Sequence, residues 1–150
     1  MGMHTPPAVP IGLQVINAAQ LVSDALDVAL TAAGGSLGMW QILVAASGKD
    51  QRHGAHAAFS EAMGVGATAL SDEAHRTEVA GLVVRKPDPQ HSHEPRVELT
   101  DAGRALFHRL LLAVVAFDAR LRTGLAAEEI DVLSSMLTRL RSNIASTEPT

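Results

Sequence analysis

Residues 55–100 read AHAAFSEAMGVGATALSDEAHRTEVAGLVVRKPDPQHSHEPRVELT, and this stretch decides the fold of the chain. Helices are expected over residues 55–63 and 67–80, on either side of a tight turn that contains two glycines. Two helices joined by such a turn form a helix-turn-helix. After Gly81, two strand-like runs flank a polar tip rich in proline and histidine. This pattern predicts a β-hairpin beside the helix pair, the arrangement called a wing.

Two further helices are expected on the N-terminal side of this stretch. Residues 1–10 hold three prolines and no periodic pattern, which predicts a flexible arm. Apolar residues then recur at helical spacing over residues 11–33, and Ser36 is a suitable N-cap for the next helix. No lysine or arginine precedes Lys49. The lack of cations favours burial of the first helix between two subunits.

Two long helices are expected on the C-terminal side. Thr100 is suited to cap a helix over residues 101–122, and Gly124 separates it from a last helix over residues 127–144. Apolar positions in both helices alternate spacings of three and four, as in a coiled-coil seam. In order, these positions are Phe107, Leu110, Val114, Phe117, Leu121, Ile130, Leu133, Leu137 and Leu140.

Composition limits the classes of protein to which the chain can belong. Its 150 residues suffice for one domain with its own core. Hydrophobic residues make up 47% and the mean hydropathy is +0.14, which favours a large buried dimer interface. Without cysteine there is no disulfide, thiolate zinc site or thiol redox centre. No signal peptide is visible and polar residues interrupt residues 11–33, so a cytoplasmic protein without a membrane span is expected.

Four local features of the central stretch occur together in one register. They are the Gly64-to-Gly81 spacing, the Gly81-Leu82-Val83 end of the second helix, RKPDP at residues 85–89, and LTDAG at residues 99–103. On these features the chain resembles the winged helix-turn-helix of MarR-type transcriptional regulators, and the flanking helices match over nearly the whole length. The combination is fairly specific, although no single feature would be.

The resemblance implies a mainly α-helical fold with a small β wing and a single domain. Residues 36–100 would form the winged helix-turn-helix, while residues 11–33 and 101–146 would form the helices of an intertwined homodimer. It also implies double-stranded DNA as a partner and a small apolar or aromatic ligand that sets the DNA affinity.

Candidate DNA contacts follow from the chemistry of nucleic acids. Lysine and arginine hold phosphates, and arginine, serine and threonine side chains can also meet base edges in the grooves. The residues of these types on the second helix and the wing are Thr68, Ser71, Arg76, Arg85, Lys86 and Arg96.

Other positions depart from the pattern that the resemblance implies. Asp72 stands where the family usually has an arginine, and residues 91–93, His-Ser-His, replace an Asp-Arg-Arg run at the wing tip. A carboxylate is repelled by phosphates. Residues 49–104 hold seven basic and nine acidic side chains, so this region is not basic. Two hypotheses stay open: a regulator with an unusual operator, and a winged-helix scaffold that no longer binds DNA.

The second helix also carries polar residues on the face that should meet the core. Glu73 and Thr77 occupy positions where apolar residues normally pack, which leaves three apolar residues to hold the helix: Leu70, Ala74 and Val79. The spacing of four between Asp72 and Arg76 predicts an ion pair along the helix surface.

Under the second hypothesis the homodimer binds a small molecule or is a cofactor-free acid–base enzyme. Asp72, Glu73 and His75 would then supply the acid and base, with His75 or His108 as the imidazole partner. A salt-bridged, solvated helix surface is the simpler interpretation. A bulky apolar ligand or substrate would lie among Met39, Trp40, Phe59, Met63, Phe107 and His108.

No cofactor is expected, because the sequence holds no glycine-rich phosphate loop or cofactor fingerprint. The histidine pairs His53 with His56 and His91 with His93 could each contribute to a metal site, but no third ligand is identifiable. Solvated histidines are the preferred interpretation, so no metal is expected.

Overall fold

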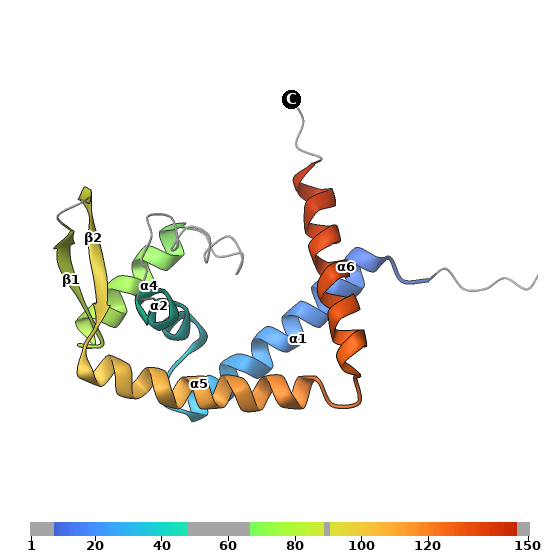
Figure 1. The fold of residues 1–150 in the computed structure, drawn as a ribbon, viewed down its shortest axis with the longest axis horizontal. Helices are drawn as coiled ribbons and strands as arrows, with labels where there is room; N and C mark the ends of the chain where they lie inside the picture. Colours follow the sequence, from blue (N-terminus) through green and yellow to red (C-terminus); the bar gives the residue numbers. More distant parts are fainter. Residues whose placement is uncertain (1–7, 48–66, 89–90, 147–150) are drawn as a thin grey trace, which may run out of the picture. The chain divides into compact units, whose positions relative to one another are not determined.

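The structure is a computed structural model that describes residues 8–47, 67–88 and 91–146, without the side chains of residues 67–70, 88 and 91–95. The predicted helix over residues 55–63 lies outside this range. Figure 1 shows the elements in chain order. Their bounds are α1 Ile11–Ala32, α2 Leu37–Ser47, α4 Ala67–Val79, β1 Val83–Asp88, β2 His91–Leu99, α5 Asp101–Leu121 and α6 Ala127–Ala145. A mainly helical fold with a small β wing is therefore confirmed.

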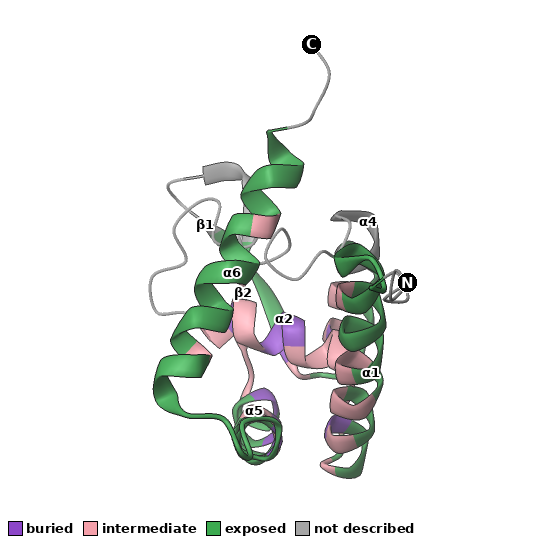
Figure 2. Cartoon of the chain, turned by 90° about the vertical axis from the view of Figure 1, so that its right-hand side faces the viewer, coloured by how far each residue is buried: buried purple, intermediate pink, exposed green. Residues whose placement is uncertain are grey.

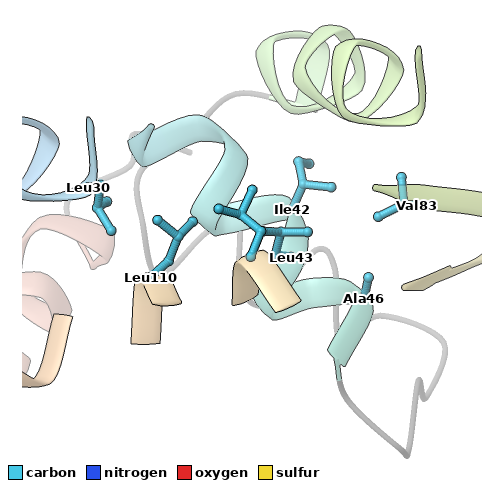
Figure 3. Packing of buried hydrophobic residues seen from close by; sticks show 7 residues of the cluster. Leu30, Ile42, Leu43, Ala46, Val83 and Leu110 are labelled. Atoms are coloured by element: carbon cyan, nitrogen blue, oxygen red, sulfur yellow. The ribbon is translucent and has the colours of Figure 1, made fainter. Parts of the chain in front are cut away.

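The chain divides into two compact units, Met1–Val114 and Val115–Thr150, and α5 crosses the boundary between them. The first unit holds the core. Its buried residues come from four elements: Leu30, Ile42, Leu43, Ala46, Val83, Leu106 and Leu110. Figure 3 shows how Ile42 and Leu43 lie between Leu110 on one side and Val83 on the other. The central element is α2, which contacts α1, α4 and β2.

The loop between α1 and α2 combines a glycine turn with the N-cap that the sequence predicted. Gly34 has a φ of 100°, and the N–H of Gly35 donates to the carbonyl of Leu30 at 2.9 Å. This is the six-residue bond of a Schellman motif, which favours glycine at the left-handed position. Ser36 then caps α2, because its Oγ accepts the N–H of Met39 at 3.1 Å.

The turn that links α4 to the wing is also a Schellman motif with glycine at the left-handed position. Gly81 has a φ of 77°, and the N–H of Leu82 donates to the carbonyl of Thr77 at 3.2 Å. The two strands then pair antiparallel, with Val83 opposite Leu99 and Lys86 opposite Arg96. The direction in which the wing leaves the helix is therefore set by one glycine turn.

Thr100 joins three parts of the winged helix. Its hydroxyl donates to the carbonyl of Gly81 at 2.7 Å and accepts the N–H of Gly103 at 3.0 Å. Its own N–H donates to the carbonyl of Leu82 at 3.0 Å. The predicted N-cap of α5 is thus confirmed, and the same side chain ties the end of α4 to the end of β2.

The second unit contains the end of α5, a turn at Gly124 and α6. Gly124 has a φ of 80°, and Glu129 accepts the N–H of Ala126 at 2.7 Å in the first turn of α6. No residue of α6 is buried, and Figure 2 shows this helix mostly exposed, with Ile130 and Leu140 half-buried. The seam positions Leu133 and Leu137 are 47% and 42% exposed. Two of the four seam positions of α6 are therefore exposed in the single chain.

Among the described helices, α1 is the one that is long and apolar enough to cross a membrane. A single helix of this kind near the N-terminus is a weak indication of a span, since core helices and signal sequences have the same composition. In this chain Leu30 of α1 is buried in the core and Asp27 accepts the N–H of Leu37 at 2.9 Å.

Candidate nucleic-acid interface

The inner face of α4 rests on the core through small and polar residues. Thr77 is fully buried and Ala74 packs, half-buried, against the core cluster. The Thr77 hydroxyl donates to the carbonyl of Glu73 at 2.7 Å, so this buried polar group is satisfied. The prediction that Val79 also holds the helix is wrong, because Val79 is 75% exposed. It follows Ala74 by five residues, which places it about 140° around the helix.

The outer face of α4 carries several of the predicted contact residues. Ser71, Asp72, His75 and Arg76 are all exposed on it. Thr68 lies in the first turn of the same helix, and its side chain is outside the described residues, as is that of Leu70. A ligand that contacts Ser71 and Arg76 on this face would therefore also lie near the carboxylate of Asp72.

Arg76 pairs with Glu73 rather than with Asp72, which corrects the predicted ion pair. Its Nη2 lies 2.8 Å from the Glu73 Oε2. The Glu73 side chain is 19% exposed and lies against Gly38 of α2, where a Cβ would come within 2.8 Å of the carboxyl group. The hydrogen bond to Glu73 raises the pKa of Arg76. Because Gly38 has no side chain, the Glu73 carboxylate has room against α2 while it pairs with Arg76 within α4.

The two faces of the wing have different chemistry. Val83 is buried and Val97 and Leu99 are half-buried against the core, so these residues form the inward face. The alternate positions face outward, and cross-strand pairing sets Val84 opposite Glu98 and Lys86 opposite Arg96. Two predicted phosphate contacts therefore lie side by side on the exposed face of the hairpin.

Each described cation of the wing is paired with a carboxylate. The Lys86 Nζ lies 2.9 Å from the Glu98 Oε2, and the Arg96 Nη1 lies 3.9 Å from the Glu98 Oε1. The Arg85 Nε lies 2.9 Å from the Glu78 Oε2 at the end of α4. The hydrogen bond from Lys86 is the main reason that the pKa of Glu98 lies below its usual value.

Charge on the described part of this surface is balanced. Residues 71–87 and 96–100 hold four basic side chains and four acidic ones. Sequence reasoning counted the acids but did not assign Glu78 and Glu98 as partners of the cations. For Glu98 a signal was present, because Arg96 and Glu98 are two residues apart on one strand and share a face. The Glu78 to Arg85 pair joins two elements and has no comparable signal.

The residues predicted for acid–base chemistry do not form a desolvated pair in the described structure. Asp72 and His75 are exposed, and the half-buried carboxylate of Glu73 is engaged by Arg76. His108 is exposed on α5, where its ring lies 6.0 Å from that of Phe107. A general acid or base gains most from burial beside its partner, and no described group of this helix has that setting.

Part of the predicted ligand pocket is brought together. The rings of Trp40 and Phe107 stack at a centroid distance of 5.4 Å and an interplanar angle of 8°, and Met39 packs beside the same core cluster. All three are half-buried. Phe59 and Met63 lie outside the described residues. The ring pair joins α2 to α5 and forms part of an apolar surface. Of these two helices, α2 also contacts α4.

Metal-binding chemistry has no candidate among the described side chains. No three histidine, aspartate or glutamate residues in this part of the chain come together as a ligand set. The side chains of His91 and His93 lie outside the described residues, as do His53 and His56.

The chain resembles known proteins in its fold more clearly than in its sequence. No protein-family model matches the sequence, and no curated protein matches it. Solved structures do match over most of the chain. A MarR/EmrR family transcriptional regulator from Acinetobacter sp. ADP1 superimposes with a TM-score of 0.79 at 17% identity, covering 91% of this chain and 96% of that one.

Two further matches were solved with small molecules. CouR from Rhodococcus jostii RHA1 bound to p-coumaroyl-CoA has a TM-score of 0.68 at 23% identity, covering 93% of this chain and 94% of that one. A MarR-family protein of Mycobacterium tuberculosis in complex with salicylic acid has a TM-score of 0.66 at 25% identity, covering 89% and 98%. The resemblance seen in the sequence is confirmed at the level of fold: this chain has the winged-helix fold of the MarR-family transcriptional regulators.

Proposed function

We propose that the chain is a ligand-responsive, MarR-like transcriptional regulator that binds double-stranded DNA as a homodimer in the cytoplasm. The observation that carries the proposal is the fold match, which extends over 91% of the chain and includes the winged helix as well as the long flanking helices. Ser71, Arg76, Arg85, Lys86 and Arg96 are exposed on α4 and the wing, where a duplex could meet them. Thr68 lies in the first turn of the same helix.

A second copy of the chain is the partner that the exposed apolar residues favour. Soluble proteins rarely leave a long apolar face uncovered. On α1 the exposed apolar residues are Ile11, Leu13, Ile16, Leu21 and Val28, and on α6 they are Val132, Leu133, Met136, Leu137 and Ile144. Helices that alternate apolar spacings of three and four bury that face against another helix.

The ligand would be a small apolar or aromatic molecule, and the ligands of two matching structures, p-coumaroyl-CoA and salicylic acid, both contain an aromatic ring. In this chain the Trp40 and Phe107 ring pair supports that choice of chemistry, because flat aromatic ligands stack on such rings. A ligand that displaced this contact would act on α2, which in turn contacts α4.

DNA fragments that flank the chain's own gene test the proposal. We expect fluorescence anisotropy to detect tighter binding to a palindromic fragment from that region than to a scrambled duplex of the same length and composition. Equal affinity for the two fragments, or no binding to either at low salt, would contradict a role as a sequence-specific regulator.

The second candidate is a small-molecule-binding homodimer that does not bind DNA. It is favoured by one observation, the equal number of acidic and basic side chains on the described surface of α4 and the wing. An acid–base enzyme is less well supported, since Asp72 and His75 are exposed to solvent. Absence of duplex binding, together with retained binding of an aromatic carboxylic acid such as salicylic acid, would favour this candidate.

A further inference from the structure

The outward face of the wing places two cations directly opposite each other. Lys86 and Arg96 are cross-strand partners, and like charges in that position repel. Glu98 follows Arg96 by two residues on the same face and reaches both cations, at 2.9 Å to Lys86 and 3.9 Å to Arg96. One carboxylate therefore offsets the charge of a pair that could otherwise hold two phosphates.

The third cation of the wing is engaged from the helix side. Arg85 extends from β1 to Glu78, the penultimate residue of α4, at 2.9 Å. The Arg85 and Glu78 side chains are 43% and 35% exposed, so water and ions reach the pair. Because the contact spans two elements, a phosphate that took Arg85 would leave the Glu78 carboxylate beside it.

Exposed ion pairs of this kind contribute little net stability, so a phosphate can displace the carboxylate. The displaced carboxylate stays attached to the protein within a few ångströms of the phosphate, unlike a mobile counterion that diffuses away. When a phosphate replaces a glutamate on one of these cations, the glutamate carboxylate therefore stays close to the phosphate. The repulsion between the two negative charges reduces the free energy gained by binding the phosphate.

We propose that Glu78 and Glu98 compete with DNA phosphates for Arg85, Lys86 and Arg96, and so limit the affinity of this winged helix for duplex DNA. The inference rests on the proposed DNA-binding function, and it assigns to Glu78 and Glu98 the role of limiting the DNA affinity. The two glutamates would lower binding to DNA of any sequence, which leaves specific base contacts to decide where the protein binds.

The test compares Glu98→Gln with the wild-type protein on a fluorescently labelled duplex of arbitrary sequence over a range of salt concentrations. Removing one carboxylate leaves one more cation charge for phosphates. We expect the slope of log K against log salt to become steeper by about 0.9 and the affinity at low salt to rise on the order of tenfold. Glu78→Gln should act in the same direction through Arg85.

Two controls separate a local effect from a general change of charge. Asp118→Asn removes a carboxylate that holds Arg122 at 2.7 Å on α5, away from α4 and the wing in the sequence, and should leave the salt slope unchanged. The double variant Glu98→Gln with Arg96→Gln restores the charge of the wing and should return the slope to the wild-type value.

The outcomes are distinct for the inference and for the proposed function. If the wild type binds DNA and Glu98→Gln binds no better, or if Asp118→Asn gives the same gain, the inference is wrong and the function stands. If the wild type binds neither this duplex nor the palindromic fragment but Glu98→Gln binds with a steep salt slope, the competition is supported and the native chain is not a DNA-binding regulator. If neither protein binds either fragment, both are overturned.

Discussion

Gly103 lies in the first turn of α5, where the helix passes the backbone of residue 82. A Cβ on Gly103 would overlap the carbonyl oxygen of Leu82. That oxygen accepts the N–H of Thr100 at 3.0 Å, so it cannot turn away without loss of a bond. Thr100 and Gly103 together hold the end of the wing against the start of α5, which gives a physical reason for both residues in the LTDAG segment.

Gly103→Ala is expected to destabilise the protein by on the order of 3 kcal/mol, because the overlap is with backbone rather than with a movable side chain. Urea unfolding followed by circular dichroism at fixed protein concentration measures the change. Gly12→Ala is the matched control, since nothing lies within 4 Å of a Cβ at Gly12 in α1 and alanine favours the helix. A Gly103→Ala protein as stable as the control would show that the junction is looser than described.

Glu98 provides a prediction on pH. Its pKa is lowered chiefly by the hydrogen bond from Lys86, so the ion pair is complete above the usual glutamate pKa and is lost as pH falls through the lowered value. An NMR titration of the Glu98 carboxyl group should give a midpoint below the ordinary glutamate value, and Lys86→Gln should raise it. The same midpoint in both proteins would mean that Lys86 does not hold this carboxylate.

At the scale of elements, local patterns predicted most of the fold. Glycine after the helix, a capping hydroxyl before it and alternation along a strand act within a few residues, so the bounds of α4 and α5, to within one residue, and the presence of the wing hairpin followed from the sequence. The prediction that Val79 packs against the core was wrong because it assumed that Leu70, Ala74 and Val79 share one helix face, whereas Val79 lies about 140° around the helix from Ala74. The partner of Arg76 was missed although Glu73 precedes it by three residues on the same helix, a spacing that also permits an ion pair.

Contacts between different elements limit what the sequence could predict about the candidate interface. The cations were identified from residue type alone, and all described ones lie exposed on α4 and the wing. Their pairing depends on which carboxylate the folded chain brings near, as for Glu78 at the end of α4 and Arg85 on β1. Local spacing carries no information on such contacts, whereas the shared strand face of Arg96 and Glu98 could have been used.

At the scale of the whole molecule, the exposed seam positions of α6 lead to a prediction on assembly. Leu137→Glu should convert the proposed homodimer into monomers, because an interface that buries a carboxylate without a partner is strongly disfavoured. Light scattering after size-exclusion chromatography measures the mass. Ser135→Glu adds the same charge to an exposed position of α6 on the opposite side of the helix and should leave the dimer intact. A dimeric Leu137→Glu protein would place the interface elsewhere.

The chain combines the fold of the MarR-family regulators with equal numbers of acidic and basic side chains on the described part of α4 and the wing. The salt dependence of DNA binding tests whether this surface holds a duplex. Anisotropy measured on the palindromic fragment beside the chain's own gene, over a series of salt concentrations, is the most direct measurement. We expect specific binding in the wild type whose affinity falls as salt rises, with a shallower slope than in Glu98→Gln. Binding that does not depend on salt, or none at low salt, would contradict the proposal that α4 and the wing hold duplex DNA.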